Sequence, residues 1–201
     1  MEKFKVPVVV IGSESVGKTS IIMRFCKNVF DQAYVPTLGS DYFTKPYIFG
    51  EKSIEFHVWD IGGQEQYKHD KEYYLRRAYV VIIVFSVDDP VSYMSLADWV
   101  DDARTSCKND PAIVLVANKI DLRDEQQGQD GGLHGDECIT SDQFCKETAS
   151  LGCDAAIEAS AKNGTGIAEI FEVAAKLSDG RGSYEPPRFS DVMILNRKRV
   201  R

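Results

Sequence analysis

The sequence predicts an α/β fold in which helices cover both faces of a wound, mostly parallel sheet. Apolar, β-branched runs recur along the chain, and helical stretches separate them. Residues 79–87 and 112–117 are apolar at nearly every position, as strands buried on both faces are. This alternation of strand and helix is typical of sheets wound from βαβ units.

The expected strands, in chain order, are Val6–Ile11, Tyr42–Phe49, Ser53–Trp59, Tyr79–Val87, Ala112–Ala117 and, more weakly, Asp154–Ala159. The expected helices, about five, are Lys18–Lys27, Gln66–Arg77, Val91–Lys108, Ser141–Ser150 and Ile167–Leu177, with Ser141 as a cap. Only Gly50-Glu51-Lys52 separates 42–49 from 53–60, which predicts an antiparallel hairpin at the sheet edge.

The chain has 201 residues, which suits one domain. Gly180–Pro187 holds two prolines and two glycines, so we expect the domain to span 1–178 and a flexible tail to span 179–201. Asp124–Glu137 is rich in Gly, Gln and Asp and is expected to form a mobile loop.

Composition narrows the function classes. The formal net charge is −7, which argues against general nucleic-acid binding. Five cysteines, an odd number with no Cys-x-x-Cys pair, favour reduced cytosolic thiols over a disulfide scaffold. The N-terminus has no signal-peptide pattern, Glu2 excludes N-myristoylation, and Tyr79–Val87 is too short to span a membrane. We therefore expect a cytoplasmic protein whose membrane contact is weak or indirect at most.

Residues Gly12 to Thr19 read Gly-Ser-Glu-Ser-Val-Gly-Lys-Thr and match the phosphate-loop pattern G-x-x-x-x-G-K-[ST] in full. The two glycines let the backbone curl so that its N–H groups point at phosphate oxygens. Lys18 is expected to contact the β- and γ-phosphates and Thr19 to offer its hydroxyl to Mg²⁺. The motif alone does not distinguish ATP from GTP.

Asn118-Lys119-Ile120-Asp121 directly follows an expected buried strand, at the sheet edge where ligands bind. A carboxylate at Asp121 can accept both N–H groups of a guanine edge, a pair that adenine does not offer. Asn118 and Lys119 would brace the loop and cover the base, and Ser160-Ala161-Lys162 supplies a second loop. These residues favour guanine specificity.

Trp59-Asp60-Ile61-Gly62-Gly63-Gln64 ends the second hairpin strand. Asp60 is placed to hold Mg²⁺ through its water shell, Gly63 to approach the γ-phosphate, and Gln64 to orient an attacking water. Upstream, Tyr34-Val35-Pro36-Thr37 offers Thr37 as a second hydroxyl ligand of Mg²⁺. Phe30 either packs on the guanine edge or is an ordinary core aromatic.

These motifs, taken in order, resemble all five motifs of the Ras superfamily of small GTPases, and the resemblance spans roughly residues 5–178. It implies a P-loop NTPase fold with a six-stranded, mostly parallel sheet and one antiparallel edge strand. It also implies a GTP-on, GDP-off cycle with switch segments near 31–43 and 61–78, and exchange factors, GTPase-activating proteins and effectors as partners.

The site residues expected from the motifs and the resemblance fall into three groups. The catalytic pair is Gln64 and Lys18, and the metal ligands are Thr19, Thr37 and Asp60. The nucleotide-binding residues are Gly12, Ser13, Glu14, Ser15, Val16, Gly17, Lys18, Thr19, Ser20, Phe30, Tyr34, Thr37, Gly63, Asn118, Lys119, Asp121, Leu122, Ser160, Ala161 and Lys162.

Within the superfamily, residues 38–42 and 66–78 are most similar to the Rab branch, whose members act in vesicle trafficking. Three features depart from the family pattern. Glu14 replaces a small residue, which predicts slow intrinsic hydrolysis and an altered response to activating proteins. Gly62 replaces an alanine, as in the Arf branch, and no cysteine follows Cys153. The missing C-terminal cysteine fits either an atypical member without a lipid anchor or a truncated chain.

Two other functions compete with an active GTPase. A nucleotide-clamped binding module with little hydrolysis is favoured by Glu14 and opposed by Gln64. A P-loop kinase or ATPase is opposed by Asp121 and the 160–162 loop, which favour guanine.

Overall fold

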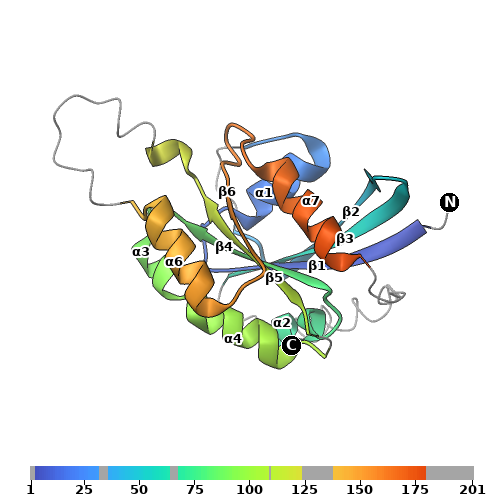
Figure 1. Ribbon diagram of the computed structural model, residues 1–201, viewed down its shortest axis with the longest axis horizontal. Helices are drawn as coiled ribbons and strands as arrows, with labels where there is room; N and C mark the ends of the chain where they lie inside the picture. The colour runs from blue at the N-terminus through green and yellow to red at the C-terminus, as the bar shows by residue number, and fades with distance from the viewer. Residues whose placement is uncertain (1–2, 32–35, 64–67, 109, 124–137, 180–201) are drawn as a thin grey trace.

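The computed structural model describes residues 3–31, 36–63, 68–108, 110–123 and 138–179. They form an α/β fold around a six-stranded sheet of order β2-β3-β1-β4-β5-β6 (Figure 1). Only the edge pair β2–β3 is antiparallel, as the sequence predicted. The strands are β1 (Lys3–Ile11), β2 (Ser40–Phe49), β3 (Lys52–Ile61), β4 (Val80–Ser86), β5 (Ala112–Asn118) and β6 (Ala155–Glu158).

Helices cover both faces of the sheet. Figure 1 shows α1 and α7 on one face and α2, α3, α4 and α6 on the other. Their bounds are α1 (Lys18–Lys27), α2 (Lys68–Leu75), α3 (Pro90–Met94), α4 (Leu96–Ser106), α6 (Ser141–Leu151) and α7 (Ile167–Ser178).

The alternation of side chains along β1 divides the core into two halves. Val8 and Val10 pack with α1 and α7, where Phe25 stacks on Phe171 with ring centroids 3.5 Å apart. Val9 and Ile11 point to the other face and join the cluster that holds α4 and α6. Every residue of β4 and β5 is buried, which confirms the prediction of strands covered on both sides.

The turn of the β2–β3 hairpin is one residue shorter than expected. Phe49 pairs directly with Lys52, so the connection consists of Gly50 and Glu51 alone. Gly50 has φ +57°, the left-handed conformation that two-residue hairpin turns need.

One helix was expected over 91–108, and the structure has two. The hydroxyl of Ser95 donates to the carbonyl oxygen of Val91 at 2.9 Å, and Ser95 lies between α3 and α4. A serine side chain that competes for a backbone acceptor favours such a break, which an apolar periodicity does not reveal.

The expected cap at Ser141 is also wrong by one residue. Thr140 is the N-cap of α6, and its hydroxyl accepts from the backbone N–H of Gln143 at 3.3 Å. The Gln143 side-chain oxygen accepts in return from the N–H of Thr140 at 2.8 Å, which completes a capping box.

Helix α7 ends at Ser178, and the expected domain boundary at this point stays a prediction. The expected mobile loop at 124–137 and the expected tail from residue 180 onward lie outside the described residues. None of the helices in the described ranges is long and apolar enough to cross a lipid bilayer.

A buried histidine lies in the β2–β3 hairpin. The hydroxyl of Tyr42 bonds to Nδ1 of His57, and Nε2 of His57 lies 3.1 Å from Oε2 of Glu55. A neutral ring with its proton on Nε2 satisfies both contacts. Burial lowers the pKa of His57 below its ordinary value, against the opposing effect of Glu55, and the charge of Lys5 on β1 lowers it further.

We therefore expect His57 to make the fold sensitive to acid. Below about pH 6.5 the unfolded chain takes up a proton on this ring that the folded chain resists, so the free energy of unfolding falls as pH falls. His57→Gln should lose less stability between pH 7.5 and pH 5.5 than the parent chain does, measured by urea unfolding. An equal loss in both proteins would contradict this assignment.

Candidate functional site

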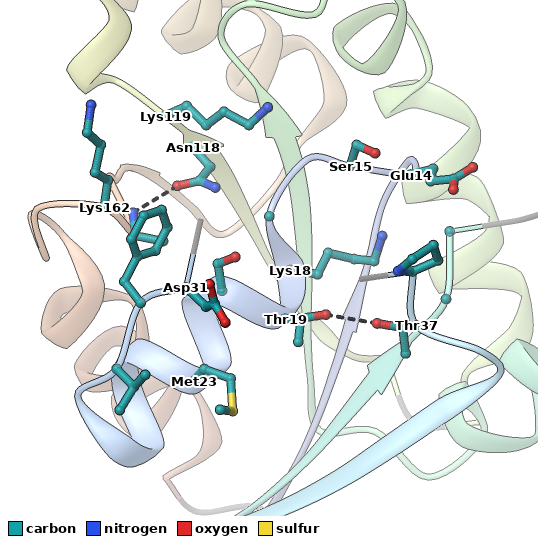
Figure 2. Close-up of a pocket in the computed structure, with 18 of the residues that line it drawn as sticks. Glu14, Ser15, Lys18, Thr19, Met23, Asp31, Thr37, Asn118, Lys119 and Lys162 are labelled. Carbon is teal, nitrogen blue, oxygen red and sulfur yellow. Dashed lines mark hydrogen bonds between the residues drawn. The ribbon is translucent and has the colours of Figure 1, made fainter. Parts of the chain in front are cut away.

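A cavity of about 820 Å³ opens at the carboxyl-terminal edge of the sheet, above the ends of β1 and β5 (Figure 2). Asn118, Lys119 and Lys162 lie toward one end, and Lys18, Thr19 and Thr37 lie toward the other. The cavity is lined by Glu14, Ser15, Gly17, Lys18, Thr19, Ser20, Met23, Val29, Phe30, Asp31, Pro36, Thr37, Gly62, Gly63, Asn118, Lys119, Asp121, Leu122, Ala161 and Lys162. This size and position are typical of a small-molecule site in an open α/β sheet.

The loop between β1 and α1 takes the conformation that its glycines allow. Gly12 has φ +137° and Gly17 has φ +95°, and Ser15 is also left-handed with φ +62°. A Cβ added to Gly12 would lie 2.1 Å from the carbonyl oxygen of Val84, so β4 leaves no room there for a side chain. Gly17 is the N-cap of α1, and the first residues of this helix line the cavity. The free N–H groups at a helix N-terminus favour an anion.

Lys18 lies inside this loop. Its Nζ donates to the carbonyl oxygens of Gly12 at 2.9 Å and Ser13 at 2.6 Å. Burial lowers the pKa of Lys18 to about 8, while the charges of Asp60 and Glu14 act to raise it. An ammonium group desolvated in this way is stabilised by an anion bound in the loop.

Three oxygen-bearing side chains meet beside Lys18. Thr19 Oγ1 donates to Asp60 Oδ2 at 2.5 Å and lies 2.9 Å from Thr37 Oγ1. Asp60 is fully buried, and its Oδ1 has no hydrogen-bond partner among the described residues. Burial raises the pKa of this carboxyl group, and the bond from Thr19 opposes that rise. Two hydroxyls and an unsatisfied carboxylate oxygen fit a hard cation such as Mg²⁺, reached directly or through water.

Gly63 packs against the phosphate-binding loop itself. A Cβ added to it would lie 2.6 Å from the backbone nitrogen of Glu14 and 2.8 Å from the carbonyl oxygen of Gly12. The neighbouring Gly62 donates its N–H to the carbonyl oxygen of Gly39 at 2.8 Å. The segment after β3 is thus held between the loop and the start of β2.

Asn118, at the end of β5, joins two loops that are distant in sequence. Its Nδ2 donates to the carbonyl oxygen of Val16 at 2.8 Å, and its Oδ1 accepts from the N–H of Ala161 at 3.2 Å. The side chain is almost completely buried. These bonds confirm the expectation that Asn118 braces the loop.

Asp121 lies at the same end of the cavity. Its Oδ1 accepts from the hydroxyl of Ser160 at 2.5 Å, and its Oδ2 lies 3.6 Å from Nζ of Lys162. The carboxylate of Asp121 is therefore oriented by the loop after β6, as expected if both loops serve one ligand.

Arg24 supports the candidate site from outside the cavity, and sequence reasoning missed it. Its guanidinium donates to the carbonyl oxygens of Ala161 at 2.9 Å and Lys162 at 2.6 Å, so that α1 supports the loop after β6. The same group lies 5.8 Å from the ring centre of Phe30. Phe30 lines the cavity and also packs against the core, and its expected contact with a guanine base stays a prediction.

The structure brings most of the predicted residues to one cavity. Gly12, Ser13, Val16, Asp60 and Ser160 lie behind its lining and act through backbone or side-chain contacts. Tyr34 and Gln64 lie outside the described residues. The lining residues that were not predicted are Met23, Val29, Asp31, Pro36 and Gly62. Helical spacing from Thr19 could have found Met23, and adjacency to Phe30 could have found Val29 and Asp31.

The fold and this site define a nucleotide-binding α/β protein of the phosphate-loop class. A family model of the Ras family matches residues 7–179, and the chain belongs to that family. Membership of this family makes the chain a GTP-binding switch protein. GTPases of the Ras family bind GTP or GDP together with Mg²⁺.

The tight packing of Gly12 gives a test of the loop. Gly12→Ala should lower the free energy of unfolding by more than about 3 kcal/mol, because the new Cβ collides with β4. Gly50→Ala is the matched control: it imposes a left-handed alanine with no heavy atom within 4 Å, and should cost about 1 kcal/mol. Urea unfolding measures both, and equal losses would mean that β4 tolerates a side chain at residue 12.

Proposed function

We propose that this chain is an active GTPase switch, which binds GTP and GDP with Mg²⁺ in the cavity, hydrolyses GTP, and binds effector proteins in its GTP state. The observation that carries the proposal is that one cavity brings together the loop 12–19, two threonine hydroxyls beside the buried Asp60 carboxylate, and the oriented Asp121 carboxylate. These are the features that a nucleotide with a phosphate chain, a divalent cation and a guanine base requires together.

In this proposal the loop 12–19 holds the phosphates through its N–H groups, and Lys18 neutralises charge on the β- and γ-phosphates. Thr19, Thr37 and Asp60 hold Mg²⁺, which when bound neutralises the charge that develops on the phosphates. Gly63 approaches the γ-phosphate with its N–H, because no Cβ intervenes. Gln64 orients the attacking water, and catalysis is largely positioning and electrostatics.

At the other end of the cavity, Asp121 accepts from the two N–H groups of guanine. Ser160 and Lys162 support this role, because both contact the carboxylate and fix its direction. Lys119 covers the base, and Phe30 packs on its edge. The remaining residues that we propose contact the nucleotide are Ser20, Tyr34, Leu122 and Ala161.

The finer assignment is to a Rab-like member with a role in vesicle trafficking or signalling. This assignment is supported by the sequence of the two expected switch segments, near 31–43 and 61–78. The two segments are in contact, because the hydroxyl of Ser40 donates to Oη of Tyr74 at 2.8 Å. Exchange factors, GTPase-activating proteins and effectors are the partners that such a switch needs.

The second candidate is a nucleotide-clamped module that barely hydrolyses GTP. Glu14 favours it, because this exposed acid lines the phosphate end of the cavity and its charge acts on Lys18. A carboxylate there repels the γ-phosphate and stands where an activating protein's arginine must approach.

The base-reading role of Asp121 has a direct test. Asp121→Asn replaces a double acceptor by a group that offers a donor, so GDP affinity should fall roughly 10²- to 10⁴-fold. Xanthine carries a carbonyl where guanine carries its amino group, so the variant should gain affinity for xanthosine diphosphate. Titration of both nucleotides into parent and variant measures this exchange, and an unchanged preference for guanine would refute the role.

Hydrolysis is tested by single turnover of bound GTP with Mg²⁺. The parent chain should form GDP slowly, at or below the order of 10⁻⁴ s⁻¹ that holds for Ras itself without an activator. Gln64→Leu should be slower still, because it removes the group that orients the water, and Glu14→Gly should be faster than the parent.

The outcomes separate the two candidates. Tight GTP binding with no conversion in the parent or in Gln64→Leu, and recovery of turnover in Glu14→Gly, identifies the clamped module. Equal rates in the parent and Glu14→Gly reject the inhibitory role of Glu14. Absence of guanine-nucleotide binding would overturn the proposed function.

A further inference from the structure

Lys119 has an unusual backbone for a residue that lines the cavity. Its φ is +64°, a left-handed conformation that residues with a Cβ rarely adopt. Hydrogen bonds hold the chain on both sides: Val87 N–H donates to the carbonyl of Asn118 at 3.0 Å, and Ile120 N–H donates to that of Ala159 at 3.2 Å. The backbone of this residue is thus fixed by the end of the sheet.

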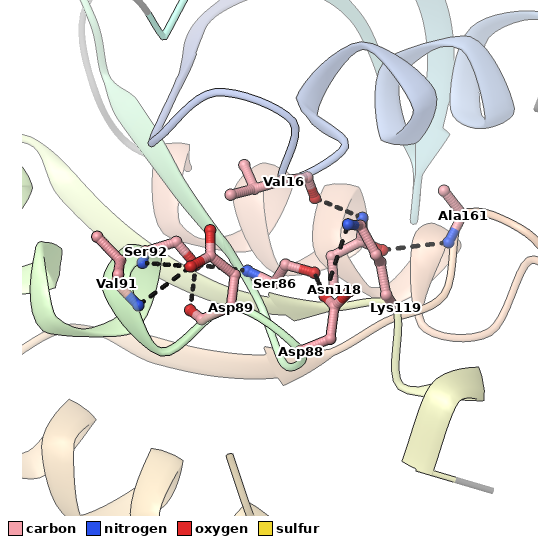
Figure 3. A network of polar contacts seen from close by, with 9 residues as sticks. All are labelled: Val16, Ser86, Asp88, Asp89, Val91, Ser92, Asn118, Lys119 and Ala161. Carbon is pink, nitrogen blue, oxygen red and sulfur yellow. Dashed lines mark hydrogen bonds and ion pairs between the residues drawn. The ribbon is translucent and has the colours of Figure 1, made fainter. Parts of the chain in front are cut away.

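The side chain of Lys119 has an ion-pair partner outside the cavity lining. Its Nζ lies 3.5 Å from Oδ1 of Asp88, which follows β4 (Figure 3). The same Oδ1 accepts from the hydroxyl of Ser86. Ser86 is buried and pairs with Asn118 in the β4–β5 ladder, so the Asp88 carboxylate is tied to the strand beside the one that Lys119 follows.

The adjacent Asp89 caps a helix instead. Its Oδ1 accepts from the N–H groups of Val91 at 3.1 Å and Ser92 at 3.2 Å, and so caps α3. Figure 3 shows the two carboxylates directed to different partners. Capping therefore does not explain Asp88, which contacts Ser86 and Lys119 instead.

We propose that Asp88 is a positioning residue that holds the Lys119 ammonium group at the cavity and thereby slows the release of bound guanine nucleotide. The proposal rests on the proposed function. A lysine side chain has several rotatable bonds, and an ion pair formed before binding removes part of the ordering cost that a bound base would otherwise impose. Both side chains are about one-third exposed, at 36% and 38%, so water and salt limit the effect.

The test compares dissociation rates of a fluorescent GDP analogue from the full chain with Mg²⁺. Asp88→Asn should release the analogue roughly two- to five-fold faster than the parent at low salt. Asparagine keeps one oxygen that can accept from Ser86, removes the negative charge and replaces the second oxygen by an NH2 group, so loss of the ion pair is the main change at this site. At about 1 M KCl the difference should shrink, because salt screens exposed charge pairs.

Three further variants test whether Asp88 acts on nucleotide release through Lys119. Lys119→Met should also release the analogue faster, and Asp88→Asn added to Lys119→Met should change nothing further. Asp89→Asn is the matched control, since asparagine caps helices about as well as aspartate and should leave the rate at the parent value. Parent-like release from Asp88→Asn, or additive effects in the double variant, would overturn the role of Asp88. Failure of the parent chain to bind the analogue would instead overturn the proposed function.

Discussion

The cavity depends on the buried side chain of Asn118. One amide accepts from the loop after β6 and donates to the loop after β1, so two loops about 43 and 102 residues away from it meet at one point. A Cβ on Gly17 would lie 2.3 Å from its Nδ2, which shows how closely the phosphate-binding loop approaches. An amide is suited to this position because it donates and accepts at once, whereas a carboxylate offers no donor to Val16. Without it, two buried backbone groups would lose their partners.

The acidic and basic groups around this amide are arranged in pairs. Lys162 faces Asp121 and Lys119 faces Asp88, each with nitrogen and oxygen about 3.5 Å apart, and a serine hydroxyl bonds to each carboxylate. Both serines are buried: Ser86 is the last residue of β4, and Ser160 lies in the loop just after β6. The rigid sheet therefore sets the direction of each carboxylate, and each carboxylate in turn orients a partly exposed lysine. Such preorganisation lowers the ordering cost of ligand binding, and partly exposed ion pairs of this kind add little to the stability of the fold.

Much of this was predictable from sequence, for identifiable reasons. Strands β4 and β5 are continuous apolar runs, and the phosphate-binding loop is a fixed motif whose glycines impose their own backbone. Side-chain contacts across the fold were not predictable, because Arg24 supports a loop 137 residues away and neither partner carries a local signal. The break at Ser95 escaped notice for a different reason, since it depends on a side chain competing for a carbonyl within an otherwise helical pattern.

Strand β3 contributes side chains both to the surroundings of the cavity and to the core on the opposite face of the sheet. Its consecutive residues Trp59 and Asp60 point to opposite sides: Asp60 meets Thr19 beside the cavity, while Trp59 lies 4.5 Å from the ring of Tyr74 on α2. Continuous pairing with β1 and β2 keeps both side chains in register. Because a one-residue slip would exchange these faces, the ladder itself keeps the Asp60 carboxylate beside Thr19 and the Trp59 indole under α2.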